Sequence, residues 1–364
     1  MIGNNSLEVI IFAEIGKTNF SSIASEELLT NLLNSLNLNK KRNIAQIFFY
    51  PIYGPKNIFK WLFFVPKKTN NTIQYFFSTS IKLLRDLIYI ISAVVKIFLL
   101  NPRFSFFYNL NKFQIKILSI IKKLFKIKFN LIQADGYLLD HLSLNMFDNV
   151  IVFSNFAYQK YKNYSLNTKL FFSYASISDS KKSKFISKLS KNKFVILHAG
   201  SISPYNTSEE SIKKIFEFCE YNKNCKVYFT NNQKLAPKYF LKLLKIAPPN
   251  FVFKGFISKN KLKNLLKEIN IGLDLRNYLD KNSGDNNCDF PSKIIFYLKN
   301  NLYVISTKSE SIPYYLRDCL IPINEIFNLD NVDFKKKEIQ INKFLEKINS
   351  QGLDQIFIKN FIEV

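Results

Sequence analysis

Short apolar runs alternate with helical stretches along the whole chain, and few folds are compatible with this alternation. The runs Leu7–Ala13 and Phe194–Ala199 are rich in residues that favour strands, and each is followed by a stretch with helical periodicity. Strands separated by helices are joined by crossover connections, which bring the strands into parallel sheets. The sequence therefore predicts an α/β protein built on parallel sheets.

The alternation is interrupted in a stretch rich in serine and lysine, Ser173–Asn192, which has no regular periodicity. The chain has 364 residues, a length that suits two domains of ordinary size. We therefore expect one Rossmann-like domain over residues 1–180, a second over residues 181–340, and a helical tail over residues 341–364.

The chain is strongly basic, with 52 lysine and arginine residues against 27 acidic ones and a net charge of +25. Such a charge favours an anionic partner, which is a nucleic acid, a membrane surface or phosphate groups. A general bias toward lysine, asparagine, isoleucine and phenylalanine explains it equally well. The lysines are spread along the chain and no nucleic-acid-binding motif is recognisable, so we do not expect a nucleic-acid partner.

Cysteine and histidine are too few and too scattered for a zinc site or a disulfide framework. The chain contains only Cys219, Cys225, Cys288 and Cys319, with no C-x-x-C pair, and two histidines, His141 and His198. We therefore expect no metal ion, and a reducing cytoplasm is the default location.

No signal peptide is recognisable at the N-terminus, because the apolar run Leu7–Ala13 is short and lacks a basic flank. The longest apolar stretch is Ile81–Leu100, which contains Lys82, Arg85, Asp86 and Lys96. These charges argue against a membrane-crossing helix and favour a buried or surface-lying one.

Ligands of parallel α/β sheets bind at the carboxyl ends of the strands, so the loops there hold the candidate site residues. Gly200 and Ser201 follow the strand Phe194–Ala199, and Gly16 and Lys17 follow the first strand. Glycine lets a backbone approach a ligand closely. Ordinary strand-ending turns would also explain both loops.

The most distinctive loop is the long polar segment Asp274–Phe290, which contains Asn287 and Asp289 and leads into Pro291, Ser292 and Lys293. Proline is favoured at the first turn of a helix, so a helix is expected to begin here. The free N–H groups of a helix N-terminus, a hydroxyl and a lysine together favour a diphosphate site. A capped helix with a solvated lysine is the alternative.

The run from Asp285 to Thr307 resembles the donor-binding segment of GT-B glycosyltransferases of the group-1 (family 4) type. That family's form is Pro-Ser-Lys, a helix with Glu-Tyr, and a Pro-Val-Ile strand. Phe194–Ser201 and Asn250–Gly255 resemble two earlier strands of the same domain. The resemblance implies two Rossmann-like domains that face each other across a cleft, the GT-B arrangement.

Several positions depart from the family pattern. The glutamate that typically holds the ribose falls at Phe296, and an earlier glutamate falls near Cys288, with Asp289 adjacent. A basic pair that grips the diphosphate falls at Ser201 and Asn206. Either Ser292, Lys293 and the asparagine-rich loop replace these groups, or the protein has lost activity.

Two residues after the strand Lys128–Gln133 are candidates for catalysis. Asp135 follows the strand directly and His141 lies nearby, in the region where such enzymes place a residue close to the reacting sugar. Either residue is suited to act as a base or to orient the acceptor. A position on a helix face is the alternative for His141, and His198 inside its strand is expected to be structural.

The stretch Lys112–Lys128 places lysines and apolar residues at helical spacing. It is typical of an amphipathic helix with a solvated basic side, and equally of a helix that lies on anionic lipid. Both interpretations remain open here.

The resemblance implies a metal-independent glycosyltransferase that moves a sugar from a nucleotide-diphosphate sugar to a glycan or lipid-linked acceptor. A bacterial surface-polysaccharide pathway, such as that of lipopolysaccharide, is the implied setting. No cofactor is expected beyond the nucleotide-sugar substrate. The implied location is the cytoplasm. Peripheral attachment to the inner face of the cytoplasmic membrane is compatible with this location. A catalytically inactive GT-B-like binding or partner protein is the alternative.

Overall fold

A computed structural model describes most of the chain: residues 7–16, 23–40, 45–52, 72–75, 81–134, 138–164, 167–174, 176, 185, 187, 189, 193–200, 202, 207–231, 236–275, 292–307 and 314–363. The chain divides into two compact units. The first unit contains residues 1–178 together with 348–364, and the second contains residues 179–287 and 291–347. Much of the expected linker, 173–192, lies outside the described residues.

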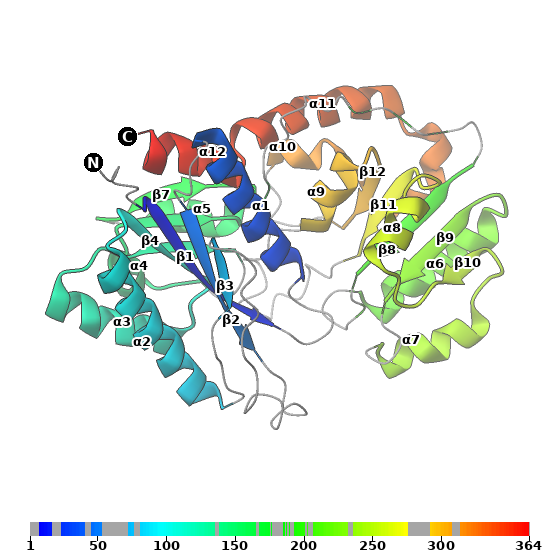
Figure 1. Ribbon diagram of the computed structural model, residues 1–364. Coiled ribbons are helices and arrows are strands. Elements are labelled where there is room, and N and C mark those ends of the chain that lie inside the picture. The colour runs from blue at the N-terminus through cyan, green and yellow to red at the C-terminus, as the bar shows by residue number, and fades with distance from the viewer. Residues whose placement is uncertain are drawn as a thin grey trace. The chain divides into compact units, whose positions relative to one another are not determined.

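The first unit is built on a parallel sheet with the strand order β3-β2-β1-β4-β5-β6-β7 (Figure 1). Its strands are β1 (Val9–Gly16), β2 (Ala45–Ile52), β3 (Ile73–Tyr75), β4 (Phe104–Tyr108), β5 (Asn130–Gln133), β6 (Asn149–Val152) and β7 (Lys169–Phe172). In the register, Val9 of β1 pairs with Ala45 on one side and Phe104 on the other.

Helices cover this sheet because its strands are apolar on both faces, as expected for buried parallel strands. They are α1 (Ile23–Lys40), α2 (Lys82–Leu100), α3 (Lys112–Phe125), α4 (His141–Asn145), α5 (Asn155–Lys162), α12 (Leu353–Phe357) and the π-helix η7 (Ile358–Ile362).

Alternate residues of the central strands pack into two separate aromatic layers. On one face, the ring of Phe12 stacks 5.4 Å from those of Phe48 and Phe107, in the core that α2 and α3 complete. On the other face, Phe106 packs 4.6 Å from Phe357 and 4.9 Å from Phe361. The period-two alternation of the strands thus separates the packing partners of neighbouring residues.

The second unit has a parallel sheet with the order β10-β9-β8-β11-β12-β13. Its strands are β8 (Val195–Ala199), β9 (Lys226–Thr230), β10 (Phe251–Phe253), β11 (Ile271–Asp274), β12 (Tyr303–Ser306) and β13 (Leu320–Pro322). Its helices are α6 (Glu209–Tyr221), α7 (Lys238–Leu243), η4 (Leu244–Ile246), α8 (Lys259–Leu265), α9 (Ser292–Lys299), α10 (Tyr314–Arg317), η6 (Ile323–Asn331) and α11 (Phe334–Ser350). The prediction of two parallel α/β sheets is confirmed.

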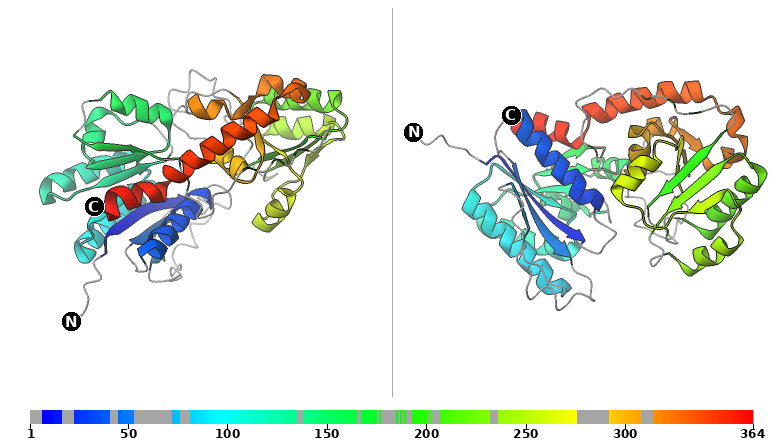
Figure 2. Two further views of the ribbon diagram at one scale, coloured as in Figure 1. Left: turned by 90° about the horizontal axis from the view of Figure 1, so that it is seen from above. Right: turned by 45° about the vertical axis from the view of Figure 1, so that its right-hand side comes forward.

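The C-terminal segment returns to the first unit (Figure 2). The Leu353 N–H donates to the carbonyl oxygen of Ser176 (2.7 Å), and the Ser35 hydroxyl donates to the Asp354 carboxylate (3.1 Å). Residues 341–364, which the sequence suggests as a separate tail, therefore contribute to α11 of the second unit and then to the core of the first.

Candidate functional site

At the carboxyl end of β8, a lysine lies in close contact with a glycine. Gly200 follows β8 directly and has a φ angle of +121°, where residues with a side chain are strained. The Lys293 side chain, from the first turn of α9, lies over this glycine. A Cβ atom at position 200 would stand 2.8 Å from Lys293 Cε and 3.2 Å from Nζ. The missing side chain at position 200 therefore makes room for the Lys293 ammonium group.

Tyr297 holds α9 in this position. Its hydroxyl accepts a hydrogen bond from the Ala199 N–H (2.8 Å) and donates to the Leu273 carbonyl oxygen (3.3 Å). Its ring lies directly on Gly272, where a Cβ atom would stand only 2.2 Å from the ring carbon Cγ. Tyr297 thus ties α9 to the ends of β8 and β11, and glycine at position 272 is what permits the contact.

This arrangement is suited to an anion. The first N–H groups of a helix have no partners within it, and the aligned peptide dipoles place partial positive charge at that end. In α9 these groups belong to the turn that contains Ser292, which is exposed, and Lys293, which is half-buried. A phosphate at the end of β8 would meet both the N–H groups and the lysine charge.

Two buried polar side chains of the second unit, those of His198 and Thr207, lie close together. His198 of β8 is fully buried, and its ring stacks 4.7 Å from that of Phe229. Its Nε2 atom lies 3.5 Å from the hydroxyl of Thr207, which is also buried. These contacts agree with the structural role expected for His198.

The first unit has a polar cluster at the carboxyl end of β1. The Glu14 carboxylate lies 3.3 Å from Arg85 Nε and accepts a hydrogen bond from Gln114 Nε2 (3.0 Å). The same amide donates to Asp86 (3.0 Å), which also accepts from Asn111 Nδ2 (3.1 Å). We call these residues the Glu14 cluster.

The start of α3 fixes the shape of the Glu14 cluster. Asn111 caps this helix by accepting from the Gln114 N–H, while the Gln114 side chain accepts from the Asn111 N–H, which is a complete capping box. Burial raises the pKa of Glu14, although Gln114 and Arg85 oppose the shift. A carboxyl group of this kind at the carboxyl edge of a sheet is a candidate for proton transfer.

Several predicted site residues lie outside the described part of the chain: Lys17, Asp135, Ser201, Asn287 and Asp289. Gly16 is the last residue of β1. The structure brings together Gly200 and Lys293, with Ser292 at the start of the same helix.

His141 is the exposed first residue of α4. Its Nε2 atom lies 3.0 Å from Asn145 Nδ2, and its ring packs edge-on 6.0 Å from Tyr164. Asn145 in turn accepts from the Asn167 N–H, just before β7 begins. These contacts place His141 near the amino end of β7, whereas Glu14 lies at the carboxyl end of β1.

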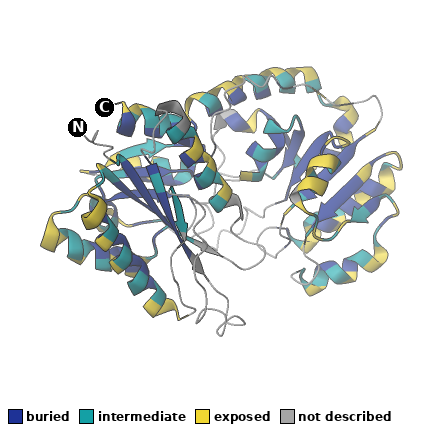
Figure 3. Ribbon diagram, in the orientation of Figure 1, coloured by how far each residue is buried: buried dark blue, intermediate teal, exposed yellow. Residues whose placement is uncertain are grey.

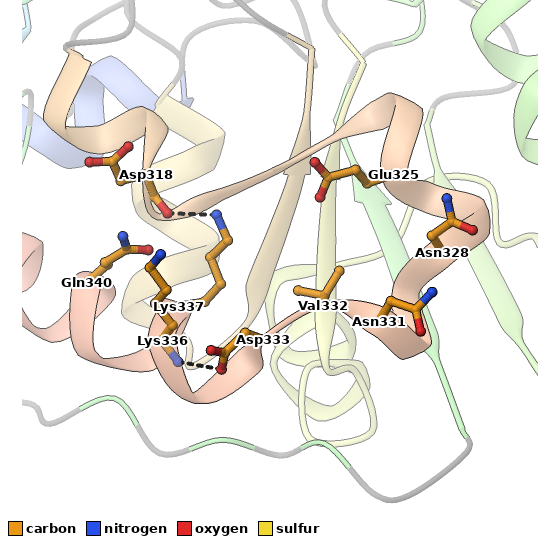
Figure 4. A pocket seen from close by; sticks show the side chains of 9 residues that line it. All are labelled: Asp318, Glu325, Asn328, Asn331, Val332, Asp333, Lys336, Lys337 and Gln340. Carbon is orange, nitrogen blue, oxygen red and sulfur yellow. Dashed lines mark hydrogen bonds between the residues drawn. The ribbon is translucent and has the colours of Figure 1, made fainter.

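A separate pocket of about 510 Å³ lies in the second unit between η6 and α11 (Figure 4). Lys337 Nζ donates to the carbonyl oxygens of Asp318 (2.8 Å) and Leu320 (2.7 Å), and burial lowers the pKa of Lys337. Because these carbonyl groups precede or begin β13, this pocket is not at the carboxyl edge that carries Lys293.

In the described parts of the chain, no group of three or more His, Cys, Asp or Glu side chains is placed to hold a metal ion. Nor does any helix in those parts combine the length and apolar character needed to cross a bilayer.

Comparison with known proteins identifies the fold. No protein-family model and no curated protein matches the chain. Among solved structures, the lipopolysaccharide outer core galactosyltransferase WaaB matches 97% of this chain and 98% of its own, with a TM-score of 0.61 and 14% identity. Sucrose-phosphate synthase from Thermosynechococcus elongatus matches 97% of each chain, with a TM-score of 0.67 and 8% identity. The chain has a GT-B fold.

A third structural match is the UDP-GlcNAc 2-epimerase from Neisseria meningitidis, solved bound to UDP-GlcNAc. It covers 98% of this chain and 100% of its own, with a TM-score of 0.58 and 10% identity. Because identities are low and the matches include an epimerase beside transferases, they establish the GT-B fold rather than a reaction.

Neither the Glu14 cluster nor the contact between Gly272 and Tyr297 was predicted from the sequence. One local signal was available, because the spacing of Asn111 and Gln114 is that of a capping box. Nothing in the sequence indicates that these residues meet Glu14, which is 100 positions from Gln114.

Proposed function

We propose that this protein is a metal-independent glycosyltransferase that moves a sugar from a nucleotide-diphosphate sugar to a glycan or lipid-linked acceptor. The observation that carries the proposal is the contact of Lys293 with Gly200 at the carboxyl end of β8. There the start of α9 and the lysine ammonium group supply the positive charge that a diphosphate needs. The GT-B fold supports this reading, because the proteins matched over nearly their whole lengths include two transferases.

In this proposal, catalysis rests on electrostatic stabilisation of the leaving group. Negative charge builds on the diphosphate as the bond to the sugar breaks, and donors already in place stabilise that charge without reorganising. Lys293 and the first N–H groups of α9 are these donors. These groups stabilise the negative charge that a bound metal cation stabilises in metal-dependent transferases.

We assign Glu14 of the first unit as the base that acts on the acceptor hydroxyl. Its side chain is 12% exposed, and Arg85 and Gln114 hold the carboxylate in one orientation. A carboxylate in this state is suited to accept the proton of an acceptor hydroxyl. Because Asp135 lies outside the described residues, it stays a second candidate for this role.

The setting we propose is bacterial surface-polysaccharide biosynthesis on the cytoplasmic side of the membrane. The support is that the matched WaaB is an outer core galactosyltransferase of lipopolysaccharide. UDP-sugars are the first donors to test, because the matched epimerase binds UDP-GlcNAc.

The test is a thermal-shift panel of nucleotide sugars, because a ligand that binds the folded state raises the melting temperature. Loss of one charge-assisted hydrogen bond costs about 1.5–3 kcal/mol, so Lys293→Ala should weaken donor binding roughly ten- to a hundredfold. Lys299→Ala removes the same charge from the last turn of the same helix and should leave binding unchanged. Equal donor affinity in Lys293→Ala and wild type would contradict the proposed site.

Turnover separates an enzyme from a binding protein. The wild type should release UDP from its preferred donor, and release should rise when a suitable glycan or lipid-linked acceptor is added. Tight donor binding without release or transfer would favour the alternative, a catalytically inactive GT-B-like protein that acts by binding.

A further inference from the structure

One face of α2 presents large apolar side chains to solvent. Leu84, Ile91, Val95 and Phe98 are exposed and recur at helical spacing. Leu99 beside them is 71% exposed. The opposite face of the same helix is buried against the sheet through residues such as Tyr89, Ile90, Ala93 and Ile97. The helix is therefore apolar on both sides, although only one side contributes to the core.

The neighbouring helix α3 repeats this pattern. Phe113, Ile120 and Leu124 are exposed at helical spacing, and Leu124 is 70% exposed. The rings of Phe98 on α2 and Phe125 on α3 pack edge-on 5.5 Å apart, so the two exposed faces adjoin. Figure 3 shows exposed residues along both helices. We call these exposed residues of α2 and α3 the apolar surface.

Lysines border the apolar surface on α3. Lys112, Lys116 and Lys123 recur at helical spacing on the adjacent side of the helix and are exposed. Beyond them lies a pocket of about 820 Å³ between α3 and α4, lined by Lys116, Lys122, Lys123, Lys126 and Lys128 together with Leu142, which is 82% exposed.

Among the described residues that line this pocket, the acidic one is Asp148. Its carboxylate is 3.1 Å from Lys122 Nζ and also accepts from the Phe129 N–H (3.0 Å). With Asp148 engaged by Lys122, the exposed Lys116, Lys123, Lys126 and Lys128 leave the pocket with an excess of positive charge.

We infer that the apolar surface and the lysine-lined pocket together bind an anionic phospholipid bilayer, with the pocket receiving lipid phosphate groups. Exposed apolar patches of this kind mark interaction sites. Lysines beside apolar residues on a surface helix are typical of helices that lie in the membrane interface. The exposed leucine, isoleucine and valine side chains favour a bilayer over a nucleic acid, which would gain little from contact with aliphatic groups. The inference does not depend on the proposed transferase activity.

The test is co-sedimentation of the full chain with vesicles of phosphatidylcholine alone or mixed with phosphatidylglycerol. Wild type should pellet with the mixed vesicles, and high salt should release part of it, because salt screens exposed charge. One lysine near an anionic surface strengthens binding about fivefold, so Lys123→Gln with Lys126→Gln should lower the partition coefficient roughly thirtyfold. Leu99→Ser with Leu124→Ser should lower it at least about tenfold through lost apolar burial.

Matched variants of the second unit give the controls. Lys261→Gln with Lys263→Gln on α8 removes the same charge, and Ile246→Ser replaces a side chain that is also 71% exposed. Both should bind vesicles as the wild type does. The inference is overturned if wild type binds neutral and mixed vesicles equally, or if the α8 variant loses as much binding as the α3 variant. It is also overturned if wild type prefers random-sequence RNA to the mixed vesicles.

A thermal-shift measurement with a nucleotide sugar tests donor binding independently of vesicle binding. All four variants should respond to the donor as the wild type does, because none alters α9 or Gly200. Loss of vesicle binding with an intact donor response supports the inference and also shows that the variants fold.

Discussion

At the scale of single residues, the place of the Lys293 ammonium group depends on the backbone at position 200. Gly200→Ala should displace it, because the new Cβ atom would stand 2.8 Å from Lys293 Cε, and the φ angle of +121° is strained for alanine. We expect donor affinity to fall about tenfold or more, as for the loss of a charge-assisted hydrogen bond. Titration calorimetry with the preferred nucleotide sugar measures this.

Gly255→Ala is the matched control. Gly255 also has a positive φ angle, +65°, but a Cβ atom there would meet nothing within 4 Å. This variant should lose some stability through backbone strain and keep its donor affinity. If both alanine variants lost affinity equally, strain alone would account for the effect at Gly200.

Glu14 provides a pH-dependent prediction. Burial raises its pKa above 4.5 in the folded state, so the folded protein holds this proton at pH values where the unfolded chain has lost it. The contribution of Glu14 to stability is therefore fully present at low pH and is lost as pH rises through the folded-state pKa. The free energy of unfolding of wild type, relative to Glu14→Gln, should fall from acid to neutral pH in urea titrations. A difference that rises over this range would contradict the assignment.

Candidate site residues could be predicted from the sequence where the residues that form the site are adjacent in the chain. Ser292 and Lys293 were recognisable because proline, serine and lysine at a helix start form a local pattern. Glu14 was not, because its partners Arg85 and Gln114 come from distant segments, and the burial that raises its pKa exists only after the sheet has formed.

At the scale of elements, the position of α9 depends on the Tyr297 hydroxyl, which bonds to the backbone of both β8 and β11. Tyr297→Phe leaves the half-buried Ala199 N–H and the buried Leu273 carbonyl oxygen without this partner. We expect it to cost about 1–3 kcal/mol of stability, measured by urea unfolding, and to weaken donor binding through a looser helix. Tyr221→Phe, whose parent side chain is 76% exposed, should change neither.

The elements that were easiest to predict were those with long periodic patterns. The apolar and basic faces of α3 follow from its residue spacing, whereas nothing in the sequence distinguishes a solvated basic face from one that binds lipid. The edge strands β3 and β13 have only three residues each, too few for a periodic pattern to show.

At the scale of the whole molecule, the first unit depends on the last helical turns of the chain. Phe361 is 1% exposed, and its ring packs 4.9 Å from Phe106 and 5.5 Å from Phe171. Phe361→Ala should cost about 3–5 kcal/mol of stability, because it leaves a cavity against the sheet. Urea unfolding measures this, with Ile339→Ala as the control, since Ile339 is 58% exposed. A loss below about 1 kcal/mol for Phe361→Ala would mean that the segment is dispensable.

The two parallel sheets could be predicted because alternating strands and helices leave few topologies open. The return of the C-terminal segment could not be predicted, because the apolar residues of α12 and η7 would fit any exposed apolar face. The contacts of α12 and η7 are made with aromatic side chains of β4 and β7, which come together only when the sheet has formed.

The return of the chain to its first unit also affects how the protein is made. Residues 179–347 are synthesised after the first sheet and before the segment that covers one of its faces. At about 5–20 residues per second, this takes roughly ten to thirty seconds, during which the nascent chain lacks the cover for Phe104, Phe106 and Phe171. A ribosome that stalls within the second half therefore holds a chain with an aromatic sheet face open to chaperones and proteases. The aromatic face is covered only after Phe357 and Phe361 have been added to the chain.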